Sequence, residues 1–330
     1  MSVLVTGGAG YIGSHMVWRL IDAGEDVVVL DTLATGFAWA VAPEARLVEG
    51  DCGDEALVGR LIDEHRVEAI IHFAGSVVVP ESVADPLGYY LNNTVKGRSL
   101  IAAAVAGKVR HFIFSSTAAV YGTPAMSPVG EDAPLHPGSP YGRSKMMVEM
   151  MLADTAAAHD FAYVALRYFN VAGADPAGRA GQSSKGATHL IKVAAEAALG
   201  KRAEMTVYGT DYPTPDGTCV RDYIHVSDLV VAHSDALRHL RAGGASLVAN
   251  CGYGRGYSVL EVIETVKRVS GKTFRVVHGD RRAGDSVSVV ASPALLMSKF
   301  GWKPRYDSLD EIVASALAWE AALDRRNRRD

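Results

Sequence analysis

The amino-acid sequence predicts an α/β fold: a doubly wound parallel sheet followed by a smaller mixed α/β lobe. Short apolar runs rich in Val, Ile and Phe alternate with helical segments through the first half of the chain. This alternation is typical of a parallel sheet with helices on both faces. After about residue 170 the rhythm changes, because turn-rich segments at 173–178 and 209–217 separate shorter elements. A chain of 330 residues is also long for one core, which favours two lobes.

The elements of the first half follow in regular order. Strands are expected at 3–5, 27–30, 46–49, 69–73, 111–115 and 163–166. Helices are expected at 15–23, 55–64, 89–106 and 141–158. We therefore predict one domain over 1–170 and a second over 171–330, with a segment near 220–240 returning to the first. Ligands of such sheets bind outside the carboxyl ends of the strands.

The turn between the first strand and the first helix is rich in glycine. Gly7, Gly10 and Gly13 are spaced three residues apart, and such a turn lets backbone N–H groups approach a pyrophosphate at the helix N-terminus. Asp31 ends the second strand, close to the spacing of roughly 20 residues expected for a carboxylate that binds an adenosine ribose. Neither of the next two residues is an arginine that could bind a 2′-phosphate. The unit predicts a Rossmann-type site for NAD rather than NADP.

A second motif places a phenol and an ammonium group on one helix face. Tyr141 and Lys145 are four residues apart, which puts them on the same side of the predicted helix. To act as a base near neutral pH, the tyrosine pKa must fall from about 10 to near 7, a change worth about 4 kcal/mol. The lysine and a positively charged nicotinamide can together supply this. With the hydroxyl cluster at 115–117, the pair predicts a hydride-transfer site.

Bulk properties exclude several classes of function. The net charge of −4 argues against a nucleic-acid partner. No apolar run approaches the roughly 20 residues of a membrane span, and we expect no export signal. Three cysteines without a C-x-x-C pair suit a reducing cytoplasm. No H-E-x-x-H motif or histidine cluster predicts a metal site.

These motifs resemble the UDP-glucose 4-epimerase family of the extended short-chain dehydrogenase/reductase superfamily. The resemblance covers nearly the whole chain and rests on TGGAGYIGSH, HFAG, PLGYYLNN, FSSTAAVYG, SPYGRSK, LRYFNVAGA, YGTDYPTPDGTCVRDYIHVSDL and RRAGD. The first and fifth stretches define the superfamily, whereas the seventh is far more specific to the epimerases. The resemblance implies an isomerase of nucleotide-sugar and galactose metabolism that interconverts UDP-glucose and UDP-galactose.

The resemblance also implies a mechanism and its residues. Tyr141 takes the proton of the 4-hydroxyl, hydride passes from C4 to tightly held NAD, the 4-keto sugar turns over, and hydride returns to its other face. The implied catalytic residues are Tyr141, Lys145 and Thr117. The implied cofactor residues are Gly7, Gly10, Tyr11, Ile12, Gly13, Asp31, Asp51, Cys52, Phe73, Ala74, Asn92, Lys145 and Tyr168. The implied UDP-sugar residues are Thr117, Tyr141, Asn170, His189, Leu190, Tyr208, Arg221, Arg282, Asp285 and Val289.

The chain departs from the family pattern at several of these positions. Thr117 stands where the family has serine, and it keeps the hydroxyl. A lysine common after HFAG is replaced by the stretch at 76–79, and His189 stands where asparagine is frequent. Val289 aligns with a tyrosine of many bacterial members, and its smaller side chain predicts activity on UDP-N-acetylglucosamine and UDP-N-acetylgalactosamine. The resemblance further implies a homodimer through a four-helix bundle built from helices 89–106 and 141–158.

Other functions remain open at this point. The resemblance implies that a nucleotide-sugar 4,6-dehydratase carries Asp-Glu after the threonine, where this chain has Ala118 and Ala119, and alanine cannot transfer protons. A 4-epimerase of UDP-xylose and UDP-arabinose needs only the same chemistry on a smaller sugar, whereas one of UDP-glucuronate needs a further cation. A net dehydrogenase would release NADH. A non-catalytic NAD-binding regulator usually lacks the tyrosine or lysine that this chain keeps.

Overall fold

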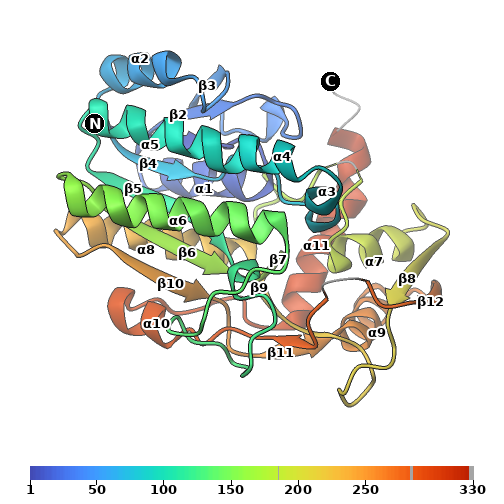
Figure 1. Cartoon of the computed structure of the whole chain (residues 1–330). Coiled ribbons are helices and arrows are strands. Elements are labelled where there is room, and N and C mark those ends of the chain that lie inside the picture. Colours follow the sequence, from blue (N-terminus) through green and yellow to red (C-terminus); the bar gives the residue numbers. More distant parts are fainter. Residues whose placement is uncertain (185, 283–284, 327–330) are drawn as a thin grey trace.

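A parallel sheet of seven strands forms the centre of the molecule (Figure 1). This computed structural model describes residues 1–330 except 185, 283–284 and 327–330. The strand order is β10-β6-β5-β4-β1-β2-β3, and every neighbouring pair is parallel. The strands are β1 (Ser2–Thr6), β2 (Asp26–Asp31), β3 (Arg46–Glu49), β4 (Val67–His72), β5 (His111–Thr117), β6 (Ala162–Tyr168) and β10 (Leu247–Cys251).

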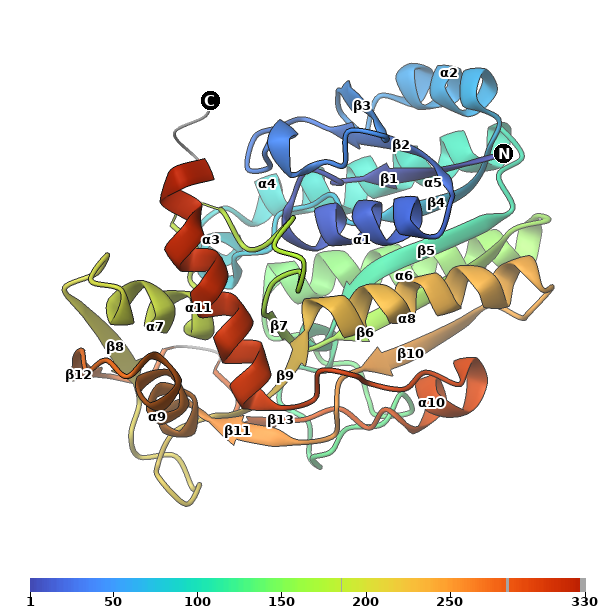
Figure 2. The same ribbon diagram turned by 180° about the vertical axis from the view of Figure 1, so that it is seen from behind.

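Helices cover both faces of this sheet. The helices α2 (Glu55–His65), α5 (Lys96–Ala106) and α6 (Pro140–Ala158) lie on one face (Figure 1), and α1 (Tyr11–Asp22) and α8 (Val226–Arg241) lie on the other (Figure 2). Alternate strand residues feed two separate cores, because successive side chains of a strand point to opposite faces. Val3 and Val5 pack with α1 and α8, whereas Leu4 packs with α2, α5 and α6. This arrangement confirms the predicted doubly wound Rossmann-type fold.

The strand order reverses between β1 and β4, which places the ligand crevice at their carboxyl ends. The chain runs from β1 outward to β3 on one side, and then from β4 outward to β10 on the other. The glycine-rich turn follows β1, and the 115–117 hydroxyls close β5. Both predicted motifs therefore lie at the same edge of the sheet.

A second lobe, mixed in α and β structure, lies beside this edge (Figure 2). Its strands are β7 (Asn170–Ala172), β8 (Glu204–Tyr208), β9 (Val220–His225), β11 (Gly256–Ser258), β12 (Arg275–Gly279) and β13 (Ser288–Val289). Its helices include α7 (Leu190–Ala198), α9 (Val259–Ser270) and α11 (Leu309–Arg326), while α10 (Ala294–Phe300) packs on α8 and β10. α7, α9 and α11 share an apolar core. The lobe thus has a core of its own.

The structure differs from the predicted elements in three places. The segment expected as one helix over 89–106 is divided into α4 (Pro86–Tyr89), the wider π-helical turn η2 (Tyr90–Val95) and α5, after a short helix α3 (Val79–Ala84). α1 begins at Tyr11 rather than at 15, because the glycines allow the helix to start inside the turn. β10 was not predicted, and its five residues join the central sheet beside β6.

Two short 3₁₀ helices, η1 (Ala38–Ala40) and η3 (Ala118–Tyr121), follow β2 and β5 near the crevice. In the described part of the chain, no helix combines the length and the apolar character that crossing a bilayer requires.

Candidate active site

The glycine-rich turn forms a cradle that side chains would fill. Gly7 has φ +72°, and a Cβ atom there would lie 2.5 Å from the backbone nitrogen of Ala74. A Cβ on Gly13 would lie 2.1 Å from the carbonyl oxygen of Gly7. Gly10 precedes α1, and no described side chain caps the first turn of the helix. Uncapped N–H groups at a helix N-terminus bind anions, so the cradle fits the pyrophosphate of a dinucleotide.

Asp31 is held in place beside this cradle. One of its carboxylate oxygens accepts a bond from the Ala9 N–H at 2.9 Å, and the other accepts a bond from the Leu33 N–H at 2.8 Å. Each oxygen keeps a second lone pair, which can accept a ribose hydroxyl. Tyr11 donates its hydroxyl to the Gly173 carbonyl of the second lobe at 2.6 Å. Its phenol is therefore engaged in a contact between the two lobes, while its backbone remains in the cradle.

Four more predicted cofactor residues lie near the carboxyl ends of β3 and β4. Asp51 forms an ion pair of 2.6 Å with Lys96, and burial raises the pKa of the adjacent Cys52 thiol to about 11. Phe73 and Ala74 both donate their N–H groups to the carbonyl of Thr6 in β1. This pairing fixes the floor of the crevice.

Asn92 and its neighbour Asn93 tie η2 to the end of β4. Asn92 donates to Ser76 Oγ at 2.9 Å. Asn93 is buried, accepts the Ser76 N–H at 2.8 Å and donates to Ser144 Oγ at 3.0 Å. Asn93 thus connects the crevice to the helix that carries Tyr141, a role that the sequence analysis missed.

Tyr141 lies in the first turn of α6, where Ser139 caps the helix by accepting the Gly142 N–H. Its side chain is 7% exposed, and the Thr117 side chain lies beside it. Burial raises the pKa of Tyr141, and the neighbouring Thr117 hydroxyl opposes this rise. The low pKa that a base requires therefore stays a prediction that depends on the Lys145 ammonium and a positively charged nicotinamide together.

Lys145 lies one turn further along α6, in a buried position. Its Nζ donates to the Ser115 carbonyl at 3.1 Å and lies 4.9 Å from the centre of the Phe114 ring. Burial lowers the pKa of Lys145 to about 8. Tyr168, at the end of β6, is hydrogen-bonded to Ser115 Oγ at 2.5 Å. The predicted catalytic residues thus converge with a predicted cofactor residue at the ends of β5 and β6.

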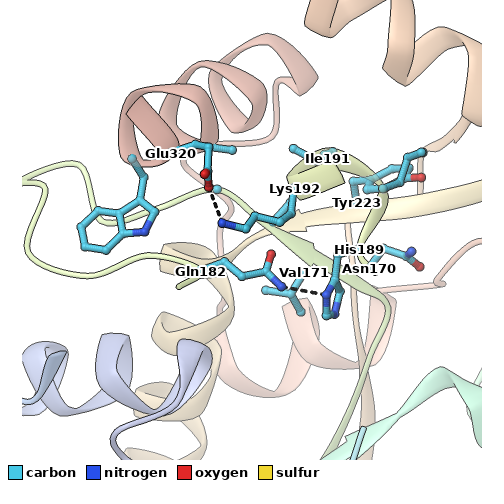
Figure 3. Close-up of a pocket in the computed structure, with 13 residues that line it drawn as sticks. Asn170, Val171, Gln182, His189, Ile191, Lys192, Tyr223 and Glu320 are labelled. Atoms are coloured by element: carbon cyan, nitrogen blue, oxygen red, sulfur yellow. Dashed lines mark hydrogen bonds and ion pairs between the residues drawn. The ribbon is translucent and has the colours of Figure 1, made fainter. Parts of the chain in front are cut away.

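A pocket between β7, α7 and α11 brings together several predicted substrate residues (Figure 3). Its walls include Asn170, His189 and Leu190. His189 Nδ1 is hydrogen-bonded to Gln182 Nε2 at 2.7 Å. Burial lowers the pKa of His189, which favours the neutral ring. His189 and Leu190 begin α7, and no described side chain caps its N-terminus.

The remaining substrate residues lie on β8, β9, β13 and the segment before β13, and three of them are charged. Arg282 donates to Asp285 at 3.0 Å, and its guanidinium lies 5.0 Å from the centre of the Tyr208 ring. Arg221 lies 3.8 Å from the same carboxylate. Val289 pairs with Arg221 in the parallel β9–β13 ladder and is buried. Two arginines beside one carboxylate are suited to a diphosphate attached to a ribose.

A buried ion pair near the predicted catalytic residues was not predicted from the sequence. Arg167 and Glu149 are joined by a contact of 2.6 Å, and Glu149 also accepts a bond from Ser116 Oγ. The sequence held one sign of this pair, a single glutamate in the otherwise apolar stretch at 146–152. A charged residue is almost never buried without a partner, so this glutamate indicated a buried ion pair. Among the described residues, no group of three or more His, Cys, Asp or Glu side chains could hold a metal ion.

Comparison with known proteins places this chain in a family. The model of the NAD dependent epimerase/dehydratase family matches residues 3–252. A UDP-glucose 4-epimerase of Azospirillum brasilense is 55% identical over 322 residues, covering 98% of this chain and 92% of that protein.

Solved structures agree with this sequence similarity. The UDP-glucose 4-epimerase of Brucella ovis in complex with NAD has a TM-score of 0.93 and 45% identity, covering 96% of this chain and 97% of that one. The enzyme of Stenotrophomonas maltophila with bound NAD and formylated UDP-arabinopyranose has a TM-score of 0.95 and 38% identity, covering 99% of both chains. The chain belongs to the NAD dependent epimerase/dehydratase family.

Proposed function

We propose that this protein is an NAD-dependent isomerase that interconverts UDP-glucose and UDP-galactose at C4 of the sugar. The observation that carries the proposal is the convergence of Tyr141, Lys145 and Thr117 beside the glycine cradle. Curated UDP-glucose 4-epimerases that match almost the whole chain support the same reaction. Dehydration is disfavoured because Ala118 and Ala119 follow the threonine.

Each catalytic side chain has a separate role in the transfer of the proton. NAD, when bound, supplies the acceptor and the later donor of the hydride at C4. Tyr141 Oη takes the proton of the 4-hydroxyl, and Lys145 holds positive charge beside it. Thr117 Oγ1 accepts the Ala119 N–H at 3.1 Å, so its own hydrogen remains available to donate. A bond donated by Thr117 favours the charged phenolate and orients the sugar oxygen.

The nucleotide is held away from the reacting carbon. We assign the diphosphate to Arg221, Arg282 and the N-terminus of α7 at His189 and Leu190, where positive charge and free N–H groups favour an anion. Asp285 accepts bonds from the uridine ribose. Because these contacts do not change during the reaction, the sugar can rotate between two orientations while the nucleotide stays bound.

A second substrate class is favoured by one residue. We propose that Val289 leaves space for an N-acetyl group at C2, so that UDP-N-acetylglucosamine and UDP-N-acetylgalactosamine are also interconverted. Val289 lies in a small apolar cluster with Phe169 and Val120. Its short side chain occupies less of the sugar site than a tyrosine side chain would.

We further propose that the enzyme is a homodimer in the cytoplasm, with the NAD lobe over 1–170 and the UDP-sugar lobe from 171. Several large apolar side chains are exposed on one face formed by α4, η2 and α6, including Leu87 (78%), Leu91 (55%) and Met150 (58%). A second copy of this face would form a four-helix bundle and remove these side chains from water. Cys52, Cys219 and Cys251 are free thiols, which suits a reducing compartment.

One experiment tests the proposed reaction. The purified protein is incubated separately with UDP-galactose, UDP-N-acetylgalactosamine and UDP-arabinopyranose, without added NAD, and the products are separated by chromatography. We expect UDP-glucose from the first and the N-acetyl epimer from the second. No epimer from any of them, even after NAD is supplied, would refute the proposed function. Accumulation of NADH in place of an epimer would indicate a net dehydrogenase.

A further inference from the structure

Glu149 belongs to the same row of α6 as the catalytic residues. It follows Tyr141 and Lys145 at intervals of four, and all three side chains are buried. Its carboxylate accepts bonds from Arg167 Nη2 at 2.6 Å and Nε at 3.0 Å, and from Ser116 Oγ. The side chains of Glu149 and Arg167 are each only 6% exposed. The negative charge of Glu149 is therefore shielded from solvent and is stabilised by Arg167 and Ser116.

Three consecutive residues at the end of β5 each lie against one member of this row. The Ser115 carbonyl accepts from Lys145 Nζ, Ser116 Oγ donates to Glu149, and Thr117 lies beside the Tyr141 phenol. Helix and strand are thus hydrogen-bonded at two successive points, through Lys145 and Glu149. The Glu149 contact lies two helical turns from Tyr141 along α6.

The same network extends to the second lobe. Arg167 Nη1 donates to the Tyr121 hydroxyl at 2.9 Å, which in turn donates to Asn250 Oδ1 at 2.7 Å. Asn250 Nδ2 donates to the Val129 carbonyl at 2.9 Å. The Val129 N–H donates to the Val290 carbonyl at 2.8 Å. Val290 directly follows the residue to which we assign the wall of the sugar site, so a continuous chain of bonds joins α6 to that wall.

We propose that Glu149 and Arg167 are positioning residues, whose ion pair places the Tyr141 hydroxyl and the Lys145 ammonium against the sugar. The proposal rests on the proposed function. A buried ion pair contributes little net stability compared with apolar residues of the same volume. We therefore infer that this pair serves to fix the orientation of α6 relative to β5 and β6. A displacement of about 1 Å in a catalytic site can lower a rate by about 100-fold, and the bidentate contact opposes such a displacement.

The test removes the charges while keeping the packing. In the double variant Glu149→Gln/Arg167→Met, the glutamine oxygen still accepts from Ser116 and no charge is left unpaired. We expect a thermal unfolding temperature close to that of the wild type, a kcat for UDP-galactose lower by about 100-fold, and an unchanged KM. The acid limb of the kcat–pH profile should move to higher pH, because a displaced Tyr141 loses the contacts that favour its phenolate.

Two further variants keep the test decisive. Tyr121→Phe deletes a single oxygen from the middle of the network, and we expect it to fold, to lower kcat less than the double variant and to shift the acid limb in the same direction. Asp228→Asn is the matched control, since this buried carboxylate accepts the Tyr253 hydroxyl and the Tyr306 N–H outside the network. It should lower the unfolding temperature and leave kcat unchanged.

The outcomes separate the two proposals. Absence of epimerisation by the wild type would overturn the proposed function and the positioning role with it. Wild-type activity together with an unchanged kcat and acid limb in the folded double variant and in Tyr121→Phe would overturn the positioning role alone. A loss of kcat in Asp228→Asn equal to that of the double variant would show that the effect follows stability, and would also overturn it.

Discussion

Replacement of Tyr141 by phenylalanine isolates the proton-transfer step. The substitution removes one oxygen from a side chain that is 7% exposed and otherwise fits the same space. Removal of this buried hydroxyl changes the free energy of unfolding by about 1 kcal/mol. Loss of the general base lowers kcat by about 10²–10⁴-fold, which corresponds to about 2.7–5.4 kcal/mol at the transition state. The effect on catalysis is therefore several times the effect on stability.

The assay measures catalysis and cofactor content on the same sample. UDP-glucose formed from UDP-galactose is quantified by chromatography, and bound NAD is quantified after acid release. Tyr163→Phe is the matched control, because Tyr163 is also 7% exposed and lies in β6 with no assigned role in the reaction. We expect Tyr141→Phe to retain NAD and lose turnover, and Tyr163→Phe to retain both. Loss of a general base lowers kcat by at least about 100-fold. If Tyr141→Phe keeps more than about a tenth of the wild-type kcat, then Tyr141 is not the base.

Four other predictions follow from the site and its surroundings. Gly13→Ala should abolish NAD binding, because the new Cβ would lie 2.1 Å from the Gly7 carbonyl oxygen; an unchanged NAD content after purification would contradict the cradle. Burial lowers the pKa of Lys145 to about 8, so the ammonium charge and kcat should both fall as pH rises through 8. Lys145→Arg stays charged and should move the alkaline limb of the kcat–pH profile to higher pH. An unchanged limb would show that deprotonation of Lys145 does not cause it. Val289→Tyr should lower kcat/KM for UDP-N-acetylgalactosamine relative to UDP-galactose, and an unchanged ratio would show that this residue does not set specificity. Leu91→Asp should convert the dimer to a monomer in light scattering, whereas a dimer of unchanged mass would place the interface elsewhere.

The cofactor and catalytic motifs could be predicted because each is local. The glycines lie within one turn, and Tyr141 and Lys145 lie within one helical turn, so sequence spacing alone specifies their geometry. The pairing of Arg167 with Glu149 could not be predicted, since it joins β6 to α6 across 18 positions of sequence. The Tyr11–Gly173 contact spans 162 positions, and no local pattern indicates it.

The helix expected over 89–106 also differs from the prediction because of a contact between segments distant in sequence. Its periodicity is helical throughout, and each part of it is helical in the structure. The wider turn η2 lies where Asn92 and Asn93 reach back to Ser76. That contact with the end of β4 exists only in the folded chain.

By itself, the sequence determined the α/β class, the NAD site and the Tyr141–Lys145 pair, because alternation, glycine spacing and helical periodicity act over a few residues. Only the tertiary structure decided that β10 joins the central sheet, that Arg221 and Arg282 share Asp285, and that Glu149 is paired. These contacts depend on how distant segments pack. A buried charge or a short strand has no preferred partner until packing supplies one.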